Sequence, residues 1–103
     1  MKIRHLVALS AVLFAGNAFA ADSEALFKSK SCGACHHPTN KTVGPAIQAI
    51  AAKYKGDATA QAKLEAKVRS GGKGSFGAMA MPATGKNVSD AEIKEIVSWI
   101  LTK

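Results

Sequence analysis

The segment Cys32-Gly33-Ala34-Cys35-His36 constrains this chain more than any other feature of its sequence. Two cysteines separated by two residues and followed directly by a histidine form the pattern for covalent attachment of a c-type haem. Residues three and four apart share one face of a helical turn, so Cys32 and Cys35 can both reach the vinyl groups along one haem edge. His36 would then meet the iron from the proximal side. The motif therefore predicts one covalently bound haem c with its iron.

The shortness of the chain favours the same conclusion. The sequence has 103 residues, which is enough for one small domain. Cys32 and Cys35 are its two cysteines, so it can form at most one internal disulfide. Domains of this size usually need disulfides, a metal or a cofactor to supplement their core. A haem is large, flat and apolar, and it would supply the missing core.

Three other interpretations of the motif are weaker. A dithiol oxidoreductase would carry its cysteine pair beside a βαβ pattern, and no strand is predicted before Cys32. A zinc site needs about four ligands, and His37 is the one further Cys or His after residue 20. Four neighbours on one turn cannot easily surround a tetrahedral ion. A disulfide between Cys32 and Cys35 would close only a tiny loop and would not explain His36.

The first 20 residues are typical of an export signal. Lys2 and Arg4 give a positively charged start, residues 6–15 form an apolar run, and Ala18-Phe19-Ala20 forms a small-residue cleavage site. A membrane-spanning helix needs about 18 or more apolar residues, and this run is too short. We therefore expect cleavage after Ala20, no stable membrane insertion, and a mature domain of residues 21–103 in the periplasm.

Positive charge is concentrated in the middle of the chain. Residues 25–88 contain ten Lys or Arg against Asp57 and Glu65, a net charge of +8. These basic residues are spread among Ala and Gly without interleaved aromatic side chains, so nucleic acid is not the expected partner. We expect the charge to attract an acidic surface on a partner protein.

Hydrophobic spacing and capping residues predict an all-α fold of four short helices. The first is expected from a cap at Asp22 or Ser23 to Lys30, and the second over about residues 46–55. The third is expected from a cap at Asp57 to about Ser70, where Gly71 ends it. A Gly-rich loop follows.

The last helix has the clearest predicted start. Ser89 and Glu92 form a capping box, and Val88 and Ile93 occupy the positions of a hydrophobic staple. Its buried face is expected to comprise Ile93, Ile96, Val97 and Ile100, broadened by Trp99 and Leu101. We expect Trp99 to pack against Phe27 of the first helix.

The ligand on the other side of the iron separates an electron carrier from a haem enzyme or a ligand sensor. His37, Met79 and Met81 are the remaining strong candidates after removal of the signal. His37 adjoins His36 on the attachment turn and cannot cross to the opposite haem face. Met79 and Met81 both lie in a loop that could cross that face, and Pro82 stiffens the chain after Met81. An ordinary packing role in the core is the alternative for both methionines, and it is favoured for Met79.

These features together resemble the small bacterial class I cytochromes c, in particular the cytochrome c-551 group. The resemblance covers nearly all of residues 21–103. It rests on Leu26-Phe27-Lys28, Cys32 to His36, Val43-Gly44-Pro45-Ala46, Ala51-Ala52-Lys53, Gly77 to Pro82 and Val88-Ser89-Asp90. The resemblance implies a cytochrome c fold of four short helices wrapped around one haem, with His36 and Met81 as the axial iron ligands. It also implies that the carbonyl of Pro45 accepts a hydrogen bond from His36.

The function that the resemblance implies is electron transport by a soluble periplasmic monomer, without chemistry on a substrate. The partners would be larger redox proteins with acidic docking surfaces: an electron donor, and a terminal reductase, oxidase or peroxidase. The alternative is a haem enzyme or sensor with an open sixth position.

The chain departs from the group at two places. Phe76 stands where the group commonly has a tryptophan that donates to a haem propionate, and phenylalanine has no donor. The stretch between Met81 and Val88 contains two extra residues. The resemblance implies a side-chain hydrogen bond to the methionine sulfur in this stretch, and here that bond is either lost or transferred to Thr84 or Asn87.

Overall fold

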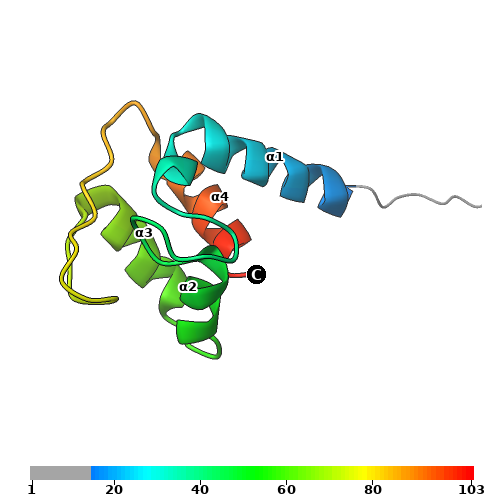
Figure 1. The fold of residues 1–103 in the computed structure, drawn as a ribbon. Helices are drawn as coiled ribbons and strands as arrows, with labels where there is room; N and C mark the ends of the chain where they lie inside the picture. The colour runs from blue at the N-terminus through cyan, green and yellow to red at the C-terminus, as the bar shows by residue number, and fades with distance from the viewer. Residues whose placement is uncertain (1–14) are drawn as a thin grey trace, which may run out of the picture.

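Residues 15–103 are described by a computed structural model that contains four α-helices and one short 3-10 turn (Figure 1). In chain order these are α1 (Ala15–Ser29), η1 (Cys32–Ala34), α2 (Ile47–Lys53), α3 (Ala60–Ser70) and α4 (Asp90–Ile100). Within the described residues, the one β-type pairing is an isolated bridge between Gly72 and Met81. The predicted all-α class is therefore confirmed.

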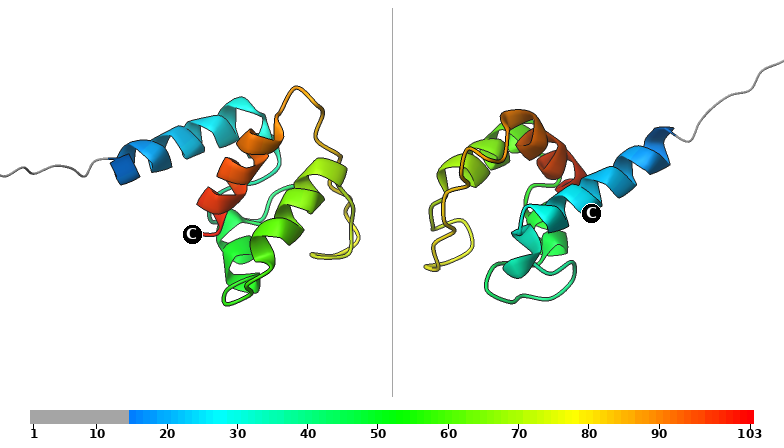
Figure 2. Two further views of the ribbon diagram at one scale, coloured as in Figure 1. Left: turned by 180° about the vertical axis from the view of Figure 1, so that it is seen from behind. Right: turned by 90° about the horizontal axis from the view of Figure 1, so that it is seen from above.

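Helix α4 lies at the centre of the arrangement and contacts α1, α2 and α3 (Figures 1 and 2). The predicted capping box at its start is confirmed. The hydroxyl of Ser89 accepts from the Glu92 backbone N–H at 3.1 Å, and the Ser89 N–H donates to the Glu92 carboxylate at 2.9 Å. The Ser89 N–H, aided by nearby Lys30, holds the pKa of Glu92 below its usual value.

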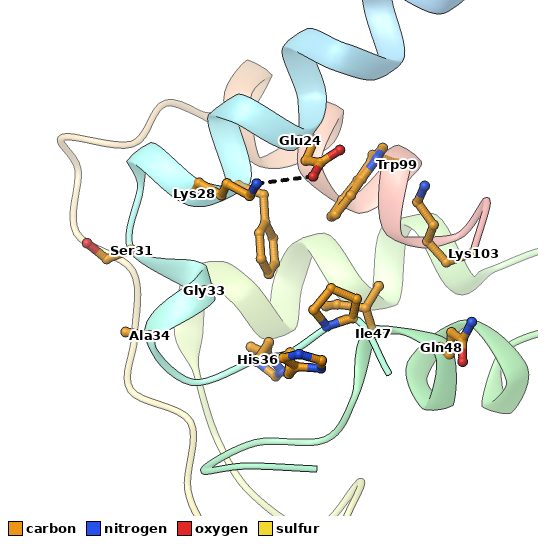
Figure 3. A pocket seen from close by; sticks show the side chains of 13 residues that line it. Glu24, Lys28, Ser31, Gly33, Ala34, His36, Ile47, Gln48, Trp99 and Lys103 are labelled. Atoms are coloured by element: carbon orange, nitrogen blue, oxygen red, sulfur yellow. Dashed lines mark ion pairs between the residues drawn. The ribbon is translucent and has the colours of Figure 1, made fainter. Parts of the chain in front are cut away.

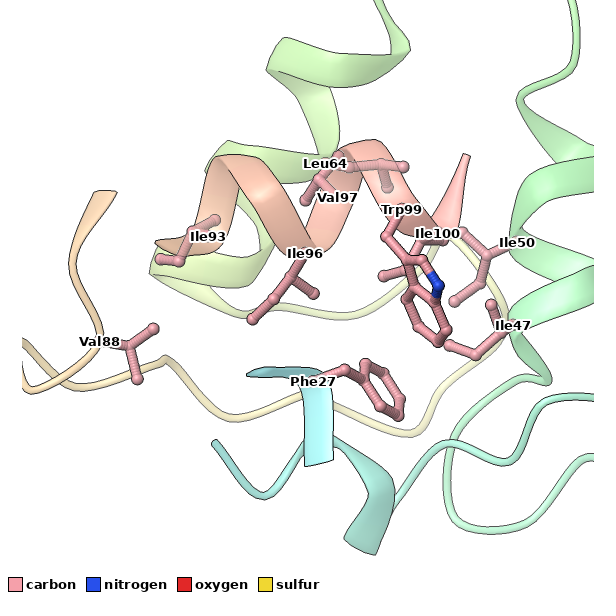
Figure 4. Packing of buried hydrophobic residues seen from close by; sticks show 10 residues of the cluster. All are labelled: Phe27, Ile47, Ile50, Leu64, Val88, Ile93, Ile96, Val97, Trp99 and Ile100. Atoms are coloured by element: carbon pink, nitrogen blue, oxygen red, sulfur yellow. The ribbon is translucent and has the colours of Figure 1, made fainter. Parts of the chain in front are cut away.

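The core gathers one face of each helix around α4 (Figure 4). The predicted contact between α1 and α4 is confirmed, because the ring centroids of Phe27 and Trp99 lie 5.1 Å apart in a tilted arrangement. The buried cluster comprises Phe27, Ile47, Ile50, Leu64, Val88, Ile93, Ile96, Val97, Trp99 and Ile100. The buried face predicted for the last helix is thus confirmed, with Leu101 partly buried at its side.

Two predicted helix starts are wrong. Neither Asp22 nor Ser23 caps α1, because the helix begins at Ala15 and continues through both residues, and several of the residues before Asp22 are alanine, the strongest helix former. The Ser23 side chain is instead buried and donates to the Glu95 carboxylate of α4 at 3.1 Å. Helix α3 begins at Ala60, three residues after Asp57, because the Asp57 carboxylate accepts from the backbone N–H of Thr59 at 2.8 Å and forms a separate turn.

Residues 1–14, which carry most of the predicted export signal, lie outside the described residues. Cleavage after Ala20 therefore stays a prediction. Among the described helices, none combines the length and the apolar character needed to cross a lipid bilayer.

Candidate haem site

The attachment segment follows α1 as a tight turn. Ser31 has a φ of 69°, a left-handed conformation that is uncommon for a residue other than glycine, and it redirects the chain from α1 into η1. The carbonyl of Cys32 then accepts from the backbone N–H groups of Cys35 at 3.2 Å and His36 at 3.0 Å. The turn thus holds both thiols and the imidazole on one short stretch of backbone.

Both thiols are available for covalent attachment. Cys32 and Cys35 are half-buried and are not joined in a disulfide. Burial raises the pKa of the Cys32 thiol, and the neighbouring Cys35 adds to the rise, so Cys32 is a neutral thiol at neutral pH. Cys32 also packs against the core cluster, as do Tyr54 and Val68. An apolar group attached at Cys32 is therefore contiguous with the core.

The imidazole of His36 is oriented by the backbone. Its Nδ1 lies 2.8 Å from the carbonyl oxygen of Pro45, which can only accept, so Nδ1 carries the proton. In the neutral ring, Nε2 is then unprotonated and has a lone pair for a metal. The structure thus brings together His36 and the Pro45 carbonyl, as the resemblance to the cytochrome c-551 group implies.

The loop between His36 and Pro45 folds back onto the attachment turn. The carbonyl of Cys35 accepts from the Gly44 backbone N–H at 2.7 Å and from the Thr42 hydroxyl at 2.8 Å. A Cβ atom at Gly44 would lie only 2.7 Å from Cε1 of His36, so this glycine is needed for the close approach. Neither role was predictable from the sequence: nothing marks Thr42 locally, and Gly44 is visible there only as part of the segment Val43-Gly44-Pro45-Ala46.

His37 lies exposed on the attachment turn. Its Nδ1 accepts from the backbone N–H groups of Thr39 and Asn40, both at 3.1 Å. The ring thus organises the first residues of the loop.

Met81 is fixed through its backbone. Its N–H donates to the carbonyl of Gly72 at 2.8 Å, and its own carbonyl accepts from the Gly72 N–H at 2.9 Å. Gly71 has a φ of 71°, and a Cβ atom there would overlap the Met81 carbonyl oxygen and lie 2.7 Å from the nitrogen of Ala83. The glycine that ends α3 therefore also lets the Met81 segment approach the helix end, a role that its position in the sequence did not reveal.

The two methionines differ in burial. Met81 is half-buried, whereas the side chain of Met79 is 71% exposed. The expected packing role of Met79 in the core is therefore wrong. The side chains of residues 76–80 are all exposed, so Met79 is not among the buried residues that form the core.

A cavity of about 600 Å³ borders the attachment turn (Figure 3). Its lining includes His36 and the apolar side chains of Phe27, Ile47 and Trp99, and an ion pair between Glu24 and Lys28 lies at its edge. Cys32, Cys35 and Met81 are not part of this lining. The cavity thus occupies one side of the turn and does not reach the methionine.

The steric role of Gly71 can be tested against a second glycine. Gly56 also has a positive φ, 81°, but has no atom within 4 Å of a Cβ position. We expect Gly56→Ala to lower the free energy of unfolding by about 1 kcal/mol through backbone strain alone. Gly71→Ala should cost about 3 kcal/mol, because the overlap with Met81 adds to that strain. Denaturant unfolding measures both values, and equal losses would contradict the packing described here.

The residues of this site fit a covalently attached haem. Two unbridged thiols lie one turn apart, the adjacent imidazole has an unprotonated ring nitrogen, and Cys32 adjoins the apolar core. This arrangement in an all-α domain defines the class of c-type cytochromes. The chain belongs to the cytochrome c family, whose family model matches residues 20–103.

Similarity to individual proteins places the chain in a smaller group within the cytochrome c family. The chain is 41% identical over 105 residues to cytochrome c-551 of Pseudomonas aeruginosa, covering 100% of this chain and 99% of that protein. It is 45% identical over 95 residues to cytochrome c-552 of Nitrosomonas europaea, covering 92% and 89% of the two chains. The crystal structure of wild-type Nitrosomonas europaea cytochrome c552 matches with a TM-score of 0.73 and 43% identity, over 77% of this chain and 96% of that one.

These relatives place the chain among the small class I cytochromes c of the c-551 and c-552 type. It is an electron carrier and not an enzyme, and its cofactor is one covalently bound haem c with iron.

Proposed function

We propose that this protein carries single electrons between larger periplasmic redox proteins, with His36 and Met81 as permanent axial ligands. The bound haem supplies a one-electron couple between ferrous and ferric iron. The observation that carries the proposal is the 2.8 Å contact between His36 Nδ1 and the Pro45 carbonyl, since it directs Nε2 away from the backbone as a ligand.

The contacts around both ligands favour a carrier over an enzyme. His36 is held by Pro45, and Met81 is held by two backbone hydrogen bonds to Gly72. None of these contacts requires a proton to move when the iron changes its charge. A thioether ligand also raises the reduction potential relative to a second imidazole.

The optical spectrum of the ferric protein tests the ligand assignment. By resemblance to the cytochrome c family, we expect methionine ligation to give a weak absorption band in the far red. A reductive titration should consume one electron per chain. A ferric protein without this band that binds added cyanide at once would instead support the alternative of an enzyme or sensor with an open sixth position.

The proposed location and mature form rest on the sequence of residues 1–20. We expect the protein from the periplasmic fraction to be a monomer that begins at Ala21. Its intact mass should exceed that of peptide 21–103 by one haem.

We propose that docking is guided by those lysines near the ligand segments that are not paired with an acidic residue. Of the five lysines nearest in sequence to the ligand segments, Lys28 pairs with Glu24 at 3.2 Å and Lys30 pairs with Glu92 at 3.5 Å. The other three, Lys41, Lys73 and Lys86, make no ion pair within the described residues. They are therefore the proposed contacts for an acidic surface on the redox partner.

Salt and charge reversal test this steering. We expect the electron transfer rate with the physiological partner to fall by about tenfold between low and physiological ionic strength, because exposed charges are screened beyond roughly 8 to 10 Å. Lys41→Glu or Lys86→Glu should slow the reaction at low salt more than Lys94→Glu or Lys103→Glu. Lys94, exposed on α4, is the cleaner control, because Lys103 also lies over the Trp99 ring at 4.9 Å. A rate independent of salt would contradict steering without affecting the electron-carrier assignment.

A further inference from the structure

The guanidinium of Arg69, near the end of α3, contacts the loop that leads into α4. Its Nη1 donates to the carbonyl oxygens of Thr84 at 3.2 Å and Gly85 at 3.0 Å. Its Nη2 donates to the carbonyl oxygen of Val88 at 2.7 Å. One side chain thus binds three backbone carbonyls, two in the middle of this loop and one just before α4.

Arg69 also contacts a carboxylate, but this contact is exposed. Nη2 lies 2.8 Å from Oδ1 of Asp90, whose side chain is 95% exposed, whereas that of Arg69 is 31% exposed. Exposed ion pairs contribute little to stability. The contacts with the carbonyls are therefore the ones expected to hold the loop. A planar guanidinium with five donors can serve all of these acceptors, whereas a lysine has a single nitrogen.

Few other hydrogen bonds hold this loop to the rest of the described chain. Residues 82–87 contain no helix or strand, and the one backbone N–H among them that bonds to another element is that of Thr84. It contacts the carbonyls of Val68 at 3.2 Å and Arg69 at 3.3 Å. Before this point the chain is joined to Gly72 at Met81. Between that bridge and α4, the Arg69 side chain supplies most of the hydrogen bonds to α3.

We propose that Arg69 is a positioning residue for Met81: by binding the carbonyls of the following loop, it determines how firmly the Met81 side chain is kept on the iron. This inference rests on the proposed function, in which Met81 is an axial ligand. Residues 82–87 contain no helix or strand, so the segment between Met81 and α4 has conformational freedom that must be restrained. Arg69 supplies that restraint from the helix end.

Three variants of the holoprotein test the proposal. Arg69→Met removes every donor at similar length, Arg69→Lys keeps the charge, and Asp90→Asn removes the ion pair but leaves the carbonyl contacts. The readout is the rate at which cyanide binds to the ferric protein, under conditions where circular dichroism shows that every variant is folded. We expect Arg69→Met to bind cyanide about tenfold faster than wild type, with Arg69→Lys in between. Asp90→Asn should stay within about twofold of wild type.

Other outcomes would overturn the proposal. A wild-type rate in Arg69→Met would show that the loop does not depend on this side chain, and an equal acceleration in Asp90→Asn would assign the effect to the ion pair. If Arg69→Met lowered the midpoint of denaturation without accelerating cyanide binding in the folded protein, Arg69 would contribute only to general stability and the proposal would be wrong.

Failure of the proposed function is separately visible. If wild type binds cyanide as fast as Met81→Ala, then Met81 is not the ligand and both the ligand assignment and the Arg69 proposal fail. Hydrogen exchange at the Met81 and Thr84 amides then shows whether Arg69 still holds the loop. Faster hydrogen exchange at these amides in Arg69→Met would show that Arg69 restrains the loop without positioning an iron ligand. Unchanged exchange would show that Arg69 does not restrain the loop either.

Discussion

Replacement of Met81 by alanine is expected to abolish the methionine band of the ferric protein and to open the iron to added cyanide or imidazole. The physical reason is that alanine has no atom that can reach or bind a metal. The reduction potential should fall by an amount on the order of 100 mV, because the axial ligand is a main determinant of haem potential. Optical spectroscopy and a redox titration measure both effects.

The matched control is Met79→Ala. Met79 lies two residues from Met81 in the same loop, and its side chain is 71% exposed. Its removal should leave the band, the potential and the cyanide rate close to those of wild type. If Met79→Ala lost the band while Met81→Ala kept it, the ligand would be two residues earlier in the chain and the proposed assignment would be wrong.

Replacement of both Cys32 and Cys35 by alanine is expected to leave a chain without covalent haem that does not fold stably. The peptide core consists of one small cluster, and domains of this size have little stability to spare once a covalent cofactor is lost. Mass spectrometry detects the missing haem, and circular dichroism with thermal unfolding detects the loss of cooperative structure.

The single variants provide the comparison. Cys32→Ala and Cys35→Ala should each keep one thioether bond and a folded chain, with a free energy of unfolding lower by about 2 to 4 kcal/mol, as for the loss of other covalent cross-links. Cys32 packs against the core cluster, so its replacement should cost more than that of Cys35. A double variant that unfolds cooperatively at the wild-type temperature would contradict the role of the haem as part of the core.

Features encoded within a few consecutive residues were predictable from the sequence. The attachment motif identified the cofactor, and Ser89 with Glu92 predicted the start of α4 correctly because a capping box closes within one turn. The apolar spacing identified the buried face of α4, including Trp99, which contacts Phe27. Local prediction failed at Asp57, because an aspartate can either cap a helix or form a turn with the residues that follow it. Here the Asp57 carboxylate forms a turn with Thr59 and does not cap α3.

The tertiary structure alone decided which distant residues surround the proposed ligands. The close approach of Gly44 to His36, the close approach of Gly71 to the Met81 backbone, and the contacts of Arg69 with backbone carbonyls all join residues between 8 and 19 positions apart. The sequence shows each of these residues only as a loop glycine, a helix-ending glycine or a basic residue on a helix. Their roles arise when the loops fold back onto the helix ends, because backbone carbonyls and steric limits carry no sequence signal until the chain brings them into contact.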